Sequence, residues 1–333
     1  MADAFQSGAN IEIIVNPFEG QPPVAGRYAV FTEIGAGPTG RVYVADDQRK
    51  SGRRVAVKVL TPRMSADMDD PTGRKRFVLA ARNAARLDHP SIVPVLAIDN
   101  VKGSGTDHVA IVYAYESWPT LAAVVRDQGP LEPDAARRII DRVAEAVDYA
   151  HENDVLHLNL HPGNIFLGPD GAVRLADFAV RGALQGDVAE HNPQRGDWLP
   201  PEQQTGGEVS RASDVYALGL ILQHCLTGEA PDPDSTEPLP GAFDLVVERA
   251  TRKTSTERLP GMEAFRHALK SPASYRTPVP SGVFVAPSVS EPQALDLGSE
   301  PAVPLGLWIA LGLGGTVLLL LCVFVIAAMW LSR

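Results

Sequence analysis

The segment HLNLHPGN, residues 157–164, has an unusual composition. It holds two histidines and two asparagines, Asn159 and Asn164, but no carboxylate. Thirteen residues after Asn164, Asp177 is the single acid in the apolar segment LADFAV, residues 175–180. One acid and two amides in neighbouring loops indicate a polar site. The motifs in the rest of the chain are needed to show what this site binds.

A glycine-rich turn, IGAGPTGRVY at residues 34–43, lies between two strand-like segments. Gly35, Gly37 and Gly40 allow backbone to approach a phosphate closely, and Val42 can pack on a base. Such turns are also ordinary hairpin structure. A dinucleotide-binding βαβ unit needs a helix directly after the glycines, whereas a second strand is expected here. The turn alone therefore leaves the ligand open.

A lysine follows on the next strand-like segment, in Val-Ala-Val-Lys at residues 55–58. Buried lysines need an anionic partner, so Lys58 on an apolar strand predicts an anion nearby. The less specific alternative is a lysine at a strand edge in solvent.

The patterns of apolar residues divide residues 27–270 into a strand-rich part and a helical part. Residues 27–115 are rich in strand-like runs with one helical segment at 73–87, and helical periodicity dominates residues 116–270. We expect a small antiparallel lobe followed by a larger helical lobe, with residues 1–26 as an N-terminal extension. Residues 271–304 are rich in Pro and Ser and predict an extended linker.

The motifs occur in one order: glycine turn, strand lysine, HxNxxxxN loop, Asp-Phe pair, and Pro-Pro-Glu at 200–202. Together they resemble the protein kinase family, particularly bacterial Ser/Thr kinases, over residues 27–270. Asp214 in SDVYALGLIL and Arg258 in STERL extend the match. The resemblance implies the α+β, two-lobed kinase fold, with a small β lobe at 27–115 and a larger helical lobe at 116–270.

The resemblance also implies residue roles in ATP binding. The three glycines of the turn cover the phosphates, and Lys58 reaches the α and β phosphates. Val42 and Ala56 line the adenine pocket, next to Tyr113 and a hinge at 114–116 that includes Tyr115. Asn164 and Asp177 match the two positions that coordinate Mg²⁺. The cofactors implied are ATP and Mg²⁺.

Structural roles follow from the same resemblance. His157 braces the 157–164 loop, while Glu202 pairs with Arg258 and Asp214 helps to tie the helical lobe together. His151 and His161 are expected on the surface, without a catalytic task.

The residues of phosphoryl transfer depart from the family pattern. Asn159 stands where the family has the Asp that accepts the substrate proton, and an amide cannot take a proton at pH 7. His161 replaces the loop lysine. Ala80 replaces the helix glutamate that anchors the strand lysine, and residues 71–87 contain no acid at all. Lys58 is therefore expected to pair with Asp177 or with the nucleotide.

The segment between Asp177 and Glu202 departs as well. It contains no Ser, Thr or Tyr, so it cannot be phosphorylated, and Leu158 replaces the arginine that receives such a phosphate. Ala179 replaces the glycine of the family's Asp-Phe-Gly motif.

The C-terminal segment 305–331 runs 27 residues without a charge, with Trp308 and Trp330 near its ends. This predicts one transmembrane helix. MADAFQSGANIEI at the N-terminus lacks the features of a signal peptide, so we expect a single-pass membrane protein with its kinase-like part in the cytoplasm. Thirty Lys and Arg against 40 Asp and Glu, with no long basic run, do not favour nucleic-acid binding.

These observations predict a membrane-anchored pseudokinase that binds ATP and acts as a signalling scaffold or allosteric regulator. Its expected partners are signalling proteins, such as another kinase. One alternative is an active, atypical Ser/Thr kinase in which Asn159 positions the substrate and solvent takes the proton. A second alternative is a scaffold that binds no nucleotide.

Overall fold

The computed structural model describes residues 27–37, 39–60, 71–102, 107–178, 198–235 and 237–272. All of them fall within the first of two units of the chain, Met1–Pro278. The predicted extension at 1–26, the linker from 273, the predicted transmembrane helix at 305–331 and Ala179 lie outside the described residues. In the described part of the chain, no helix is long and apolar enough to cross a membrane.

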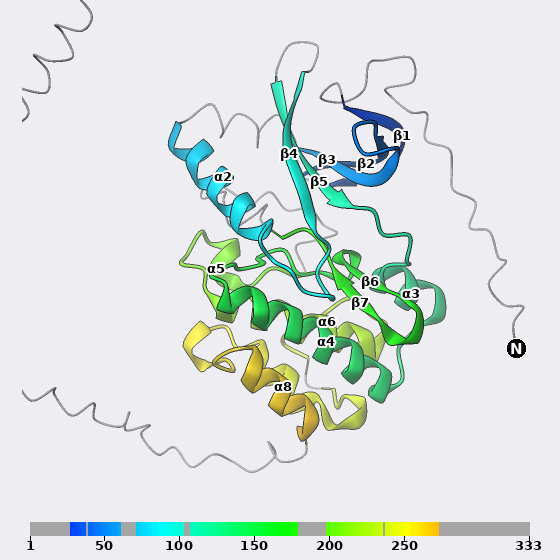
Figure 1. The fold of residues 1–333 in the computed structure, drawn as a ribbon. Coiled ribbons are helices and arrows are strands. Elements are labelled where there is room, and N and C mark those ends of the chain that lie inside the picture. The colour runs from blue at the N-terminus through cyan, green and yellow to red at the C-terminus, as the bar shows by residue number, and fades with distance from the viewer. Residues whose placement is uncertain are drawn as a thin grey trace, which may run out of the picture. The chain divides into compact units, whose positions relative to one another are not determined.

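Five antiparallel strands form the sheet of the smaller lobe, in the order β1-β2-β3-β5-β4 (Figure 1). Their bounds are β1 Tyr28–Gly37, β2 Gly40–Asp47, β3 Arg53–Leu60, β4 Val95–Lys102 and β5 Asp107–Ala114. Successive side chains of a strand point to opposite faces. Val55 and Val57 pack with Ala110 and Val112 on one face, which leaves Lys58 on the other.

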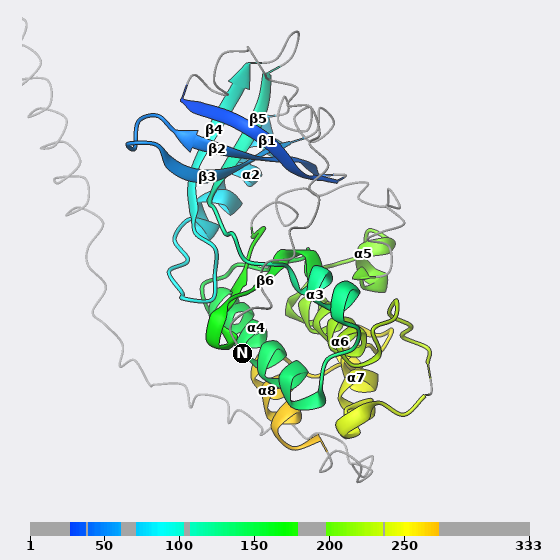
Figure 2. The same cartoon turned by 90° about the vertical axis from the view of Figure 1, so that its right-hand side faces the viewer.

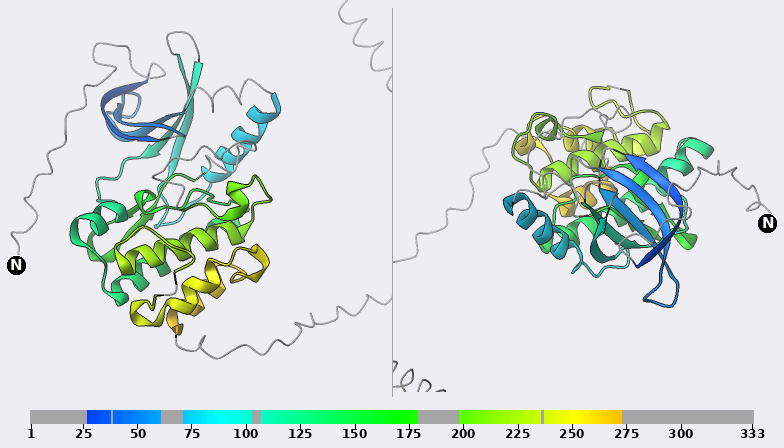
Figure 3. Two further views of the ribbon diagram at one scale, coloured as in Figure 1. Left: turned by 180° about the vertical axis from the view of Figure 1, so that it is seen from behind. Right: turned by 90° about the horizontal axis from the view of Figure 1, so that it is seen from above.

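Helix α2, Pro71–Ala84, lies beside this sheet (Figures 1 and 3). Phe77 and Ala81 are buried, at 1% and 0% exposure. The helix ends three residues before the predicted limit at 87, because the chain tightens into turns with hydrogen bonds from Arg86 N to Asn83 O and from Leu87 N to Ala84 O.

Helices dominate the larger lobe (Figure 2). Their bounds are α3 Leu121–Gln128, α4 Pro133–Glu152, α5 Pro201–Gln204, α6 Arg211–Thr227, α7 Asp244–Ala250 and α8 Met262–Lys270. α6 is buried over most of its length and packs on both α4 and α7. At Gly219 of α6 a Cβ would lie 2.6 Å from that of Ala250, so this glycine allows the close approach of α7. The predicted α+β, two-lobed arrangement is confirmed.

Candidate functional site

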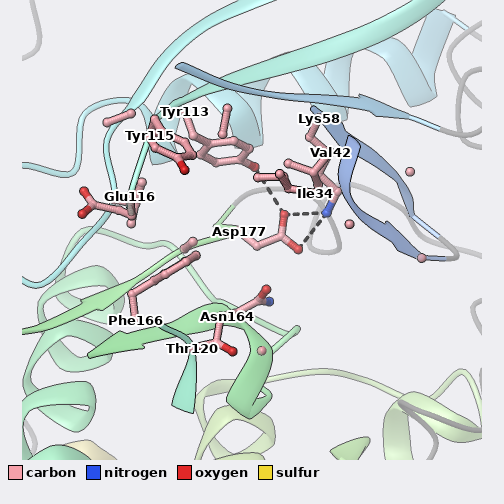
Figure 4. A pocket seen from close by; sticks show the side chains of 18 of the residues that line it. Ile34, Val42, Lys58, Tyr113, Tyr115, Glu116, Thr120, Asn164, Phe166 and Asp177 are labelled. Atoms are coloured by element: carbon pink, nitrogen blue, oxygen red, sulfur yellow. Dashed lines mark hydrogen bonds and ion pairs between the residues drawn. The ribbon is translucent and has the colours of Figure 1, made fainter. Parts of the chain in front are cut away.

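A cavity of about 430 Å³ opens between the two lobes (Figure 4). Strands β1 to β3, the segment that joins the lobes, and two loops of the larger lobe line it. The residues predicted to bind ATP or a metal ion all line this cavity: Gly35, Gly37, Gly40, Val42, Ala56, Lys58, Tyr115, Asn164 and Asp177. His161 lines the cavity as well.

A short hairpin brings the two polar loops of the larger lobe together. Strands β6, Ile165–Leu167, and β7, Val173–Leu175, pair antiparallel. Asn164 directly precedes β6, and Asp177 comes two residues after β7. The Ala176 N–H donates to the Asn164 carbonyl over 2.9 Å, which continues the pairing. The sequence therefore places the amide and the acid side by side at one end of the hairpin.

The glycine turn is formed by β1 and β2, with Gly37 opposite Gly40. Gly40 has φ +155°, and a Cβ there would lie 2.3 Å from the Val59 carbonyl oxygen. Packing against β3 thus requires this glycine whether or not a phosphate binds. A Cβ at Gly35 would instead make only an ordinary 4.0 Å contact with Val42.

Lys58 pairs with Asp177 across the cavity (Figure 4). Its Nζ atom lies 2.6 Å from Oδ1 and 2.8 Å from Oδ2. Both residues are buried, at 4% and 6% exposure, so the lysine is not in solvent. Ala80 of α2 is only packed against the core. Of the two anions expected for Lys58, the structure pairs it with Asp177.

Asn159 makes a second contact with the same carboxylate. Its Nδ2 atom lies 2.5 Å from Oδ2 of Asp177. An ionised carboxylate only accepts hydrogen bonds, so the amide nitrogen rather than the amide oxygen must face it. Asn159 is 3% exposed. At the position where the family has a proton acceptor, this chain presents a buried donor.

Tyr113 and Asn164 make further contacts with these two residues. The buried Tyr113 hydroxyl lies 3.4 Å from Oδ1 of Asp177 and 3.4 Å from the Phe178 carbonyl oxygen, so its one proton is shared between these acceptors. Burial first, and then the Asp177 charge, raise the pKa of Tyr113 well above its ordinary value, so this hydroxyl stays protonated. Asn164 donates its amide to the Asn159 carbonyl oxygen over 3.0 Å.

Asp214 fixes the backbone of the 157–164 loop through hydrogen bonds. It accepts hydrogen bonds from the backbone N–H groups of His157, over 2.9 Å, and Leu158, over 2.7 Å. Leu158 has φ 57°, a left-handed conformation that costs a side-chain-bearing residue energy and is held here by these bonds. His151 Nε2 lies 2.8 Å from Asp214 Oδ2, and His151 is buried. Its prediction as a surface residue was wrong.

His157 braces the loop from inside. Its Nε2 donates to the Ala176 carbonyl over 3.0 Å, and its Nδ1 accepts the Asn159 N–H over 3.2 Å. This pattern fits the neutral imidazole. Its ring centroid lies 4.5 Å from that of Phe178. Burial lowers the pKa of His157 below its ordinary value, which favours the same neutral form.

Glu202 and Arg258 form a bidentate ion pair, with both N···O distances 2.7 Å. Ser213 also donates to Glu202, over 2.8 Å, and the guanidinium lies 4.8 Å from the ring centroid of Tyr216. Burial alone would raise the pKa of Glu202, but the hydrogen bonds from Arg258, the backbone and Ser213 outweigh it and hold this pKa below its ordinary value.

The sequence reasoning missed a contact at the segment joining the lobes. Glu116 pairs with Arg174 of β7, and the Arg174 guanidinium lies 5.4 Å from the Trp118 ring centroid. Nothing in the sequence links residues 58 positions apart. Several apolar and small residues that line the cavity were also not predicted: Ile34, Thr39, Val93, Thr120, Phe166 and Ala176.

Mg²⁺ prefers carboxylate and carbonyl oxygens, the types of ligand that Asp177 and Asn164 offer. However, Lys58 already contacts both Asp177 oxygens, and Asn159 and Tyr113 contact one each. As they are arranged here, the predicted ligands do not fit a resident metal ion.

The model of the protein kinase domain matches residues 28–270. The chain is 35% identical over 211 residues to serine/threonine-protein kinase PrkC of Bacillus subtilis, covering 62% of this chain and 31% of that protein. It is 34% identical over 214 residues to serine/threonine-protein kinase PknB of Mycobacterium leprae, covering 63% and 34%.

The crystal structure of the PknI kinase domain of Mycobacterium tuberculosis matches with a TM-score of 0.59 and 29% identity. The match covers 76% of this chain and 97% of that one. This chain spans about a third of the length of the curated relatives it matches. The family match, the order of the motifs and the two-lobed fold agree, and the chain belongs to the protein kinase domain family.

Proposed function

We propose that this protein is a membrane-anchored pseudokinase that binds ATP and regulates signalling partners through the state of its cleft. The cavity, the glycine turn and Lys58 support nucleotide binding. The observation that argues against efficient phosphoryl transfer is Asn159, whose amide donates to Asp177 over 2.5 Å. A group that donates to Asp177 cannot act as the base for a substrate hydroxyl, a role worth about 10²–10⁴-fold in rate.

The proposed regulation follows from the coupling between ligand and conformation. Lys58 comes from the smaller lobe and Asp177 from the larger, so a nucleotide that draws Lys58 away changes the connection between the lobes. A ligand shifts such an equilibrium only by its difference in affinity for the two states. The partners proposed are signalling proteins, another kinase among them.

An active Ser/Thr kinase is the second candidate, and the intact bracing of the loop favours it. Asp214 and His157 hold residues 157–159 in place. Because phosphoryl transfer depends mainly on positioning and electrostatics, a well-positioned loop retains part of its effect without a base.

Transfer of labelled γ-phosphate from ATP separates these candidates. The full-length chain is incubated with labelled ATP, alone and with a basic protein. We expect no transfer from wild type, and little from Asn159→Asp because Ala80 and His161 remain. Clear transfer by wild type that slows strongly in Asn159→Ala would overturn the pseudokinase proposal. A melting-point increase with ATP tests nucleotide binding separately.

The membrane anchor is tested by deleting residues 305–331. A fluorescent fusion of the full chain is expected in the membrane fraction and to resist alkaline washing, whereas the deletion is expected in the soluble fraction. Release of the full chain by the alkaline wash would exclude a transmembrane helix.

A further inference from the structure

We infer that this cleft binds its nucleotide without a divalent cation, because Asn159 donates a hydrogen bond to the Asp177 carboxylate that a cation would need. The inference rests on the proposed nucleotide binding and specifies how the nucleotide is held. It makes Asn159 the residue that determines cation dependence.

The carboxylate of Asp177 has little acceptor capacity left. Two carboxylate oxygens offer about four lone-pair positions. Lys58 lies 2.6 and 2.8 Å from the two oxygens, Tyr113 lies 3.4 Å from Oδ1, and Asn159 lies 2.5 Å from Oδ2. The residue is 6% exposed. A cation could therefore reach Asp177 only by displacing a donor.

Lys58 is the donor that a nucleotide can move. Its ammonium group stands on a long, flexible side chain in the wall of the cavity, where a phosphate competes with Asp177 for it. Once Lys58 turns toward a phosphate, the Asp177 carboxylate loses the charge that compensates it.

Asn159 cannot move in this way. Its N–H donates to His157 Nδ1 over 3.2 Å, and its carbonyl accepts from Asn164 over 3.0 Å. With the backbone fixed on both sides and the side chain 3% exposed, the amide stays on Oδ2. The carboxylate then keeps one strong donor after Lys58 has left, which reduces its need for a cation.

The second expected metal ligand, Asn164, is neutral. Its amide nitrogen donates to the Asn159 carbonyl, which leaves Oδ1 as the one atom that could bind a cation. Mg²⁺ is usually held by one or two carboxylates together with substrate phosphates. Here the Asp177 carboxylate already accepts a hydrogen bond from Asn159, and Asn164 adds only one amide oxygen. These two side chains are weaker ligands for Mg²⁺ than two open carboxylates.

An aspartate at position 159 would reverse this situation. An ionised carboxylate cannot donate, and at the Asn159 position it would face Asp177 at contact distance. Two like charges so close disfavour each other, and a cation between them relieves the repulsion. Asn159→Asp should therefore convert cation-independent binding into cation-dependent binding.

The test measures ATP affinity by calorimetry on the full-length chain in detergent, with excess EDTA and with excess MgCl₂. For wild type we expect the two dissociation constants to agree within about threefold. For Asn159→Asp we expect binding in EDTA to weaken by about tenfold or more, and MgCl₂ to restore it. Asn153→Asp, the same change at an exposed helix end, should behave like wild type.

Asn159→Ala covers the case in which Asn159→Asp does not fold. It removes the donor without adding charge, so MgCl₂ should strengthen ATP binding to this variant and not to wild type. Wild-type binding that appears only with MgCl₂ would overturn the inference while leaving the proposed nucleotide binding intact. Absence of ATP binding in both conditions would overturn the proposed nucleotide binding, and the inference with it.

Discussion

Lys58 on strand β3 lies against both carboxylate oxygens of Asp177, which is 119 residues further along the chain, at 2.6 and 2.8 Å. The helix beside β3 contributes no acid, and this ion pair compensates the buried ammonium. It joins the two lobes through the cavity, and both the fold and the ligand site depend on it.

Removing the lysine should therefore destabilise the protein strongly. Lys58→Met leaves the buried Asp177 without its cation, and breaking a buried pair in this way costs about 3–5 kcal/mol. Urea unfolding of the full-length chain measures the loss of unfolding free energy. Lys253→Met is the matched control, because its ion pair with Asp234 is exposed, and it should cost less than about 1 kcal/mol.

The double variant Lys58→Met, Asp177→Asn tests the cause. It removes the uncompensated charge as well, so it should regain part of the stability that the single change loses. If Lys58→Met is as stable as Lys253→Met, the ion pair contributes nothing to folding.

The sequence predicted these loops because fixed spacing between motifs transfers from a family to a new chain. It left two anions open for Lys58, since the choice depends on distances between segments that only folding brings together. The donor role of Asn159 was hidden for the same reason. His151 is different: it lies four residues after the buried Val147 on α4, and helical periodicity could have placed it inside.

Gly40 should be required for folding independently of any nucleotide. In Gly40→Ala, the new Cβ would lie 2.3 Å from the Val59 carbonyl oxygen, and φ +155° adds backbone strain. Gly52→Ala is the control, because φ +73° gives strain of about 1–2 kcal/mol but no atom lies within 4 Å. Urea unfolding without nucleotide should show a clearly larger loss for Gly40→Ala. Equal losses would mean that the turn shifts to relieve the clash.

His157 should make stability depend on pH in the near-neutral range. Its folded-state pKa is lowered by burial, so below the ordinary value of 6.5 the unfolded chain takes up a proton more readily than the folded one. Stability should fall as pH drops below 6.5, by up to about 1.4 kcal/mol per pH unit.

The measurement is unfolding free energy for wild type and His157→Gln between about pH 7.5 and pH 5.5, above the range where carboxylates titrate. The other histidines are present in both proteins, so the difference isolates His157. The two curves should converge as pH falls. Parallel curves would show that protonation of His157 does not lower the unfolding free energy.

The ion pair of Glu202 with Arg258 should stabilise the larger lobe at neutral pH and lose this effect in acid. The folded-state pKa of Glu202 is lowered, so its contribution is complete above the ordinary value of 4.5 and is lost as pH falls through the folded-state pKa. Glu202→Gln removes the charge and should cost about 1.5–3 kcal/mol at neutral pH. The difference in unfolding free energy between wild type and Glu202→Gln should then become smaller in acid. Urea unfolding at several pH values measures this difference.

Glu248→Gln gives the matched control for this pair. Glu248 pairs with Arg252 one helical turn away, with side chains 51% and 49% exposed, so solvent screens the interaction. This variant should cost less than about 0.5 kcal/mol at neutral pH. A gap for Glu202→Gln that stays constant as the pH falls would show that Glu202 acts through its hydrogen bonds and shape, and that the charge on Arg258 is compensated by its backbone partners instead.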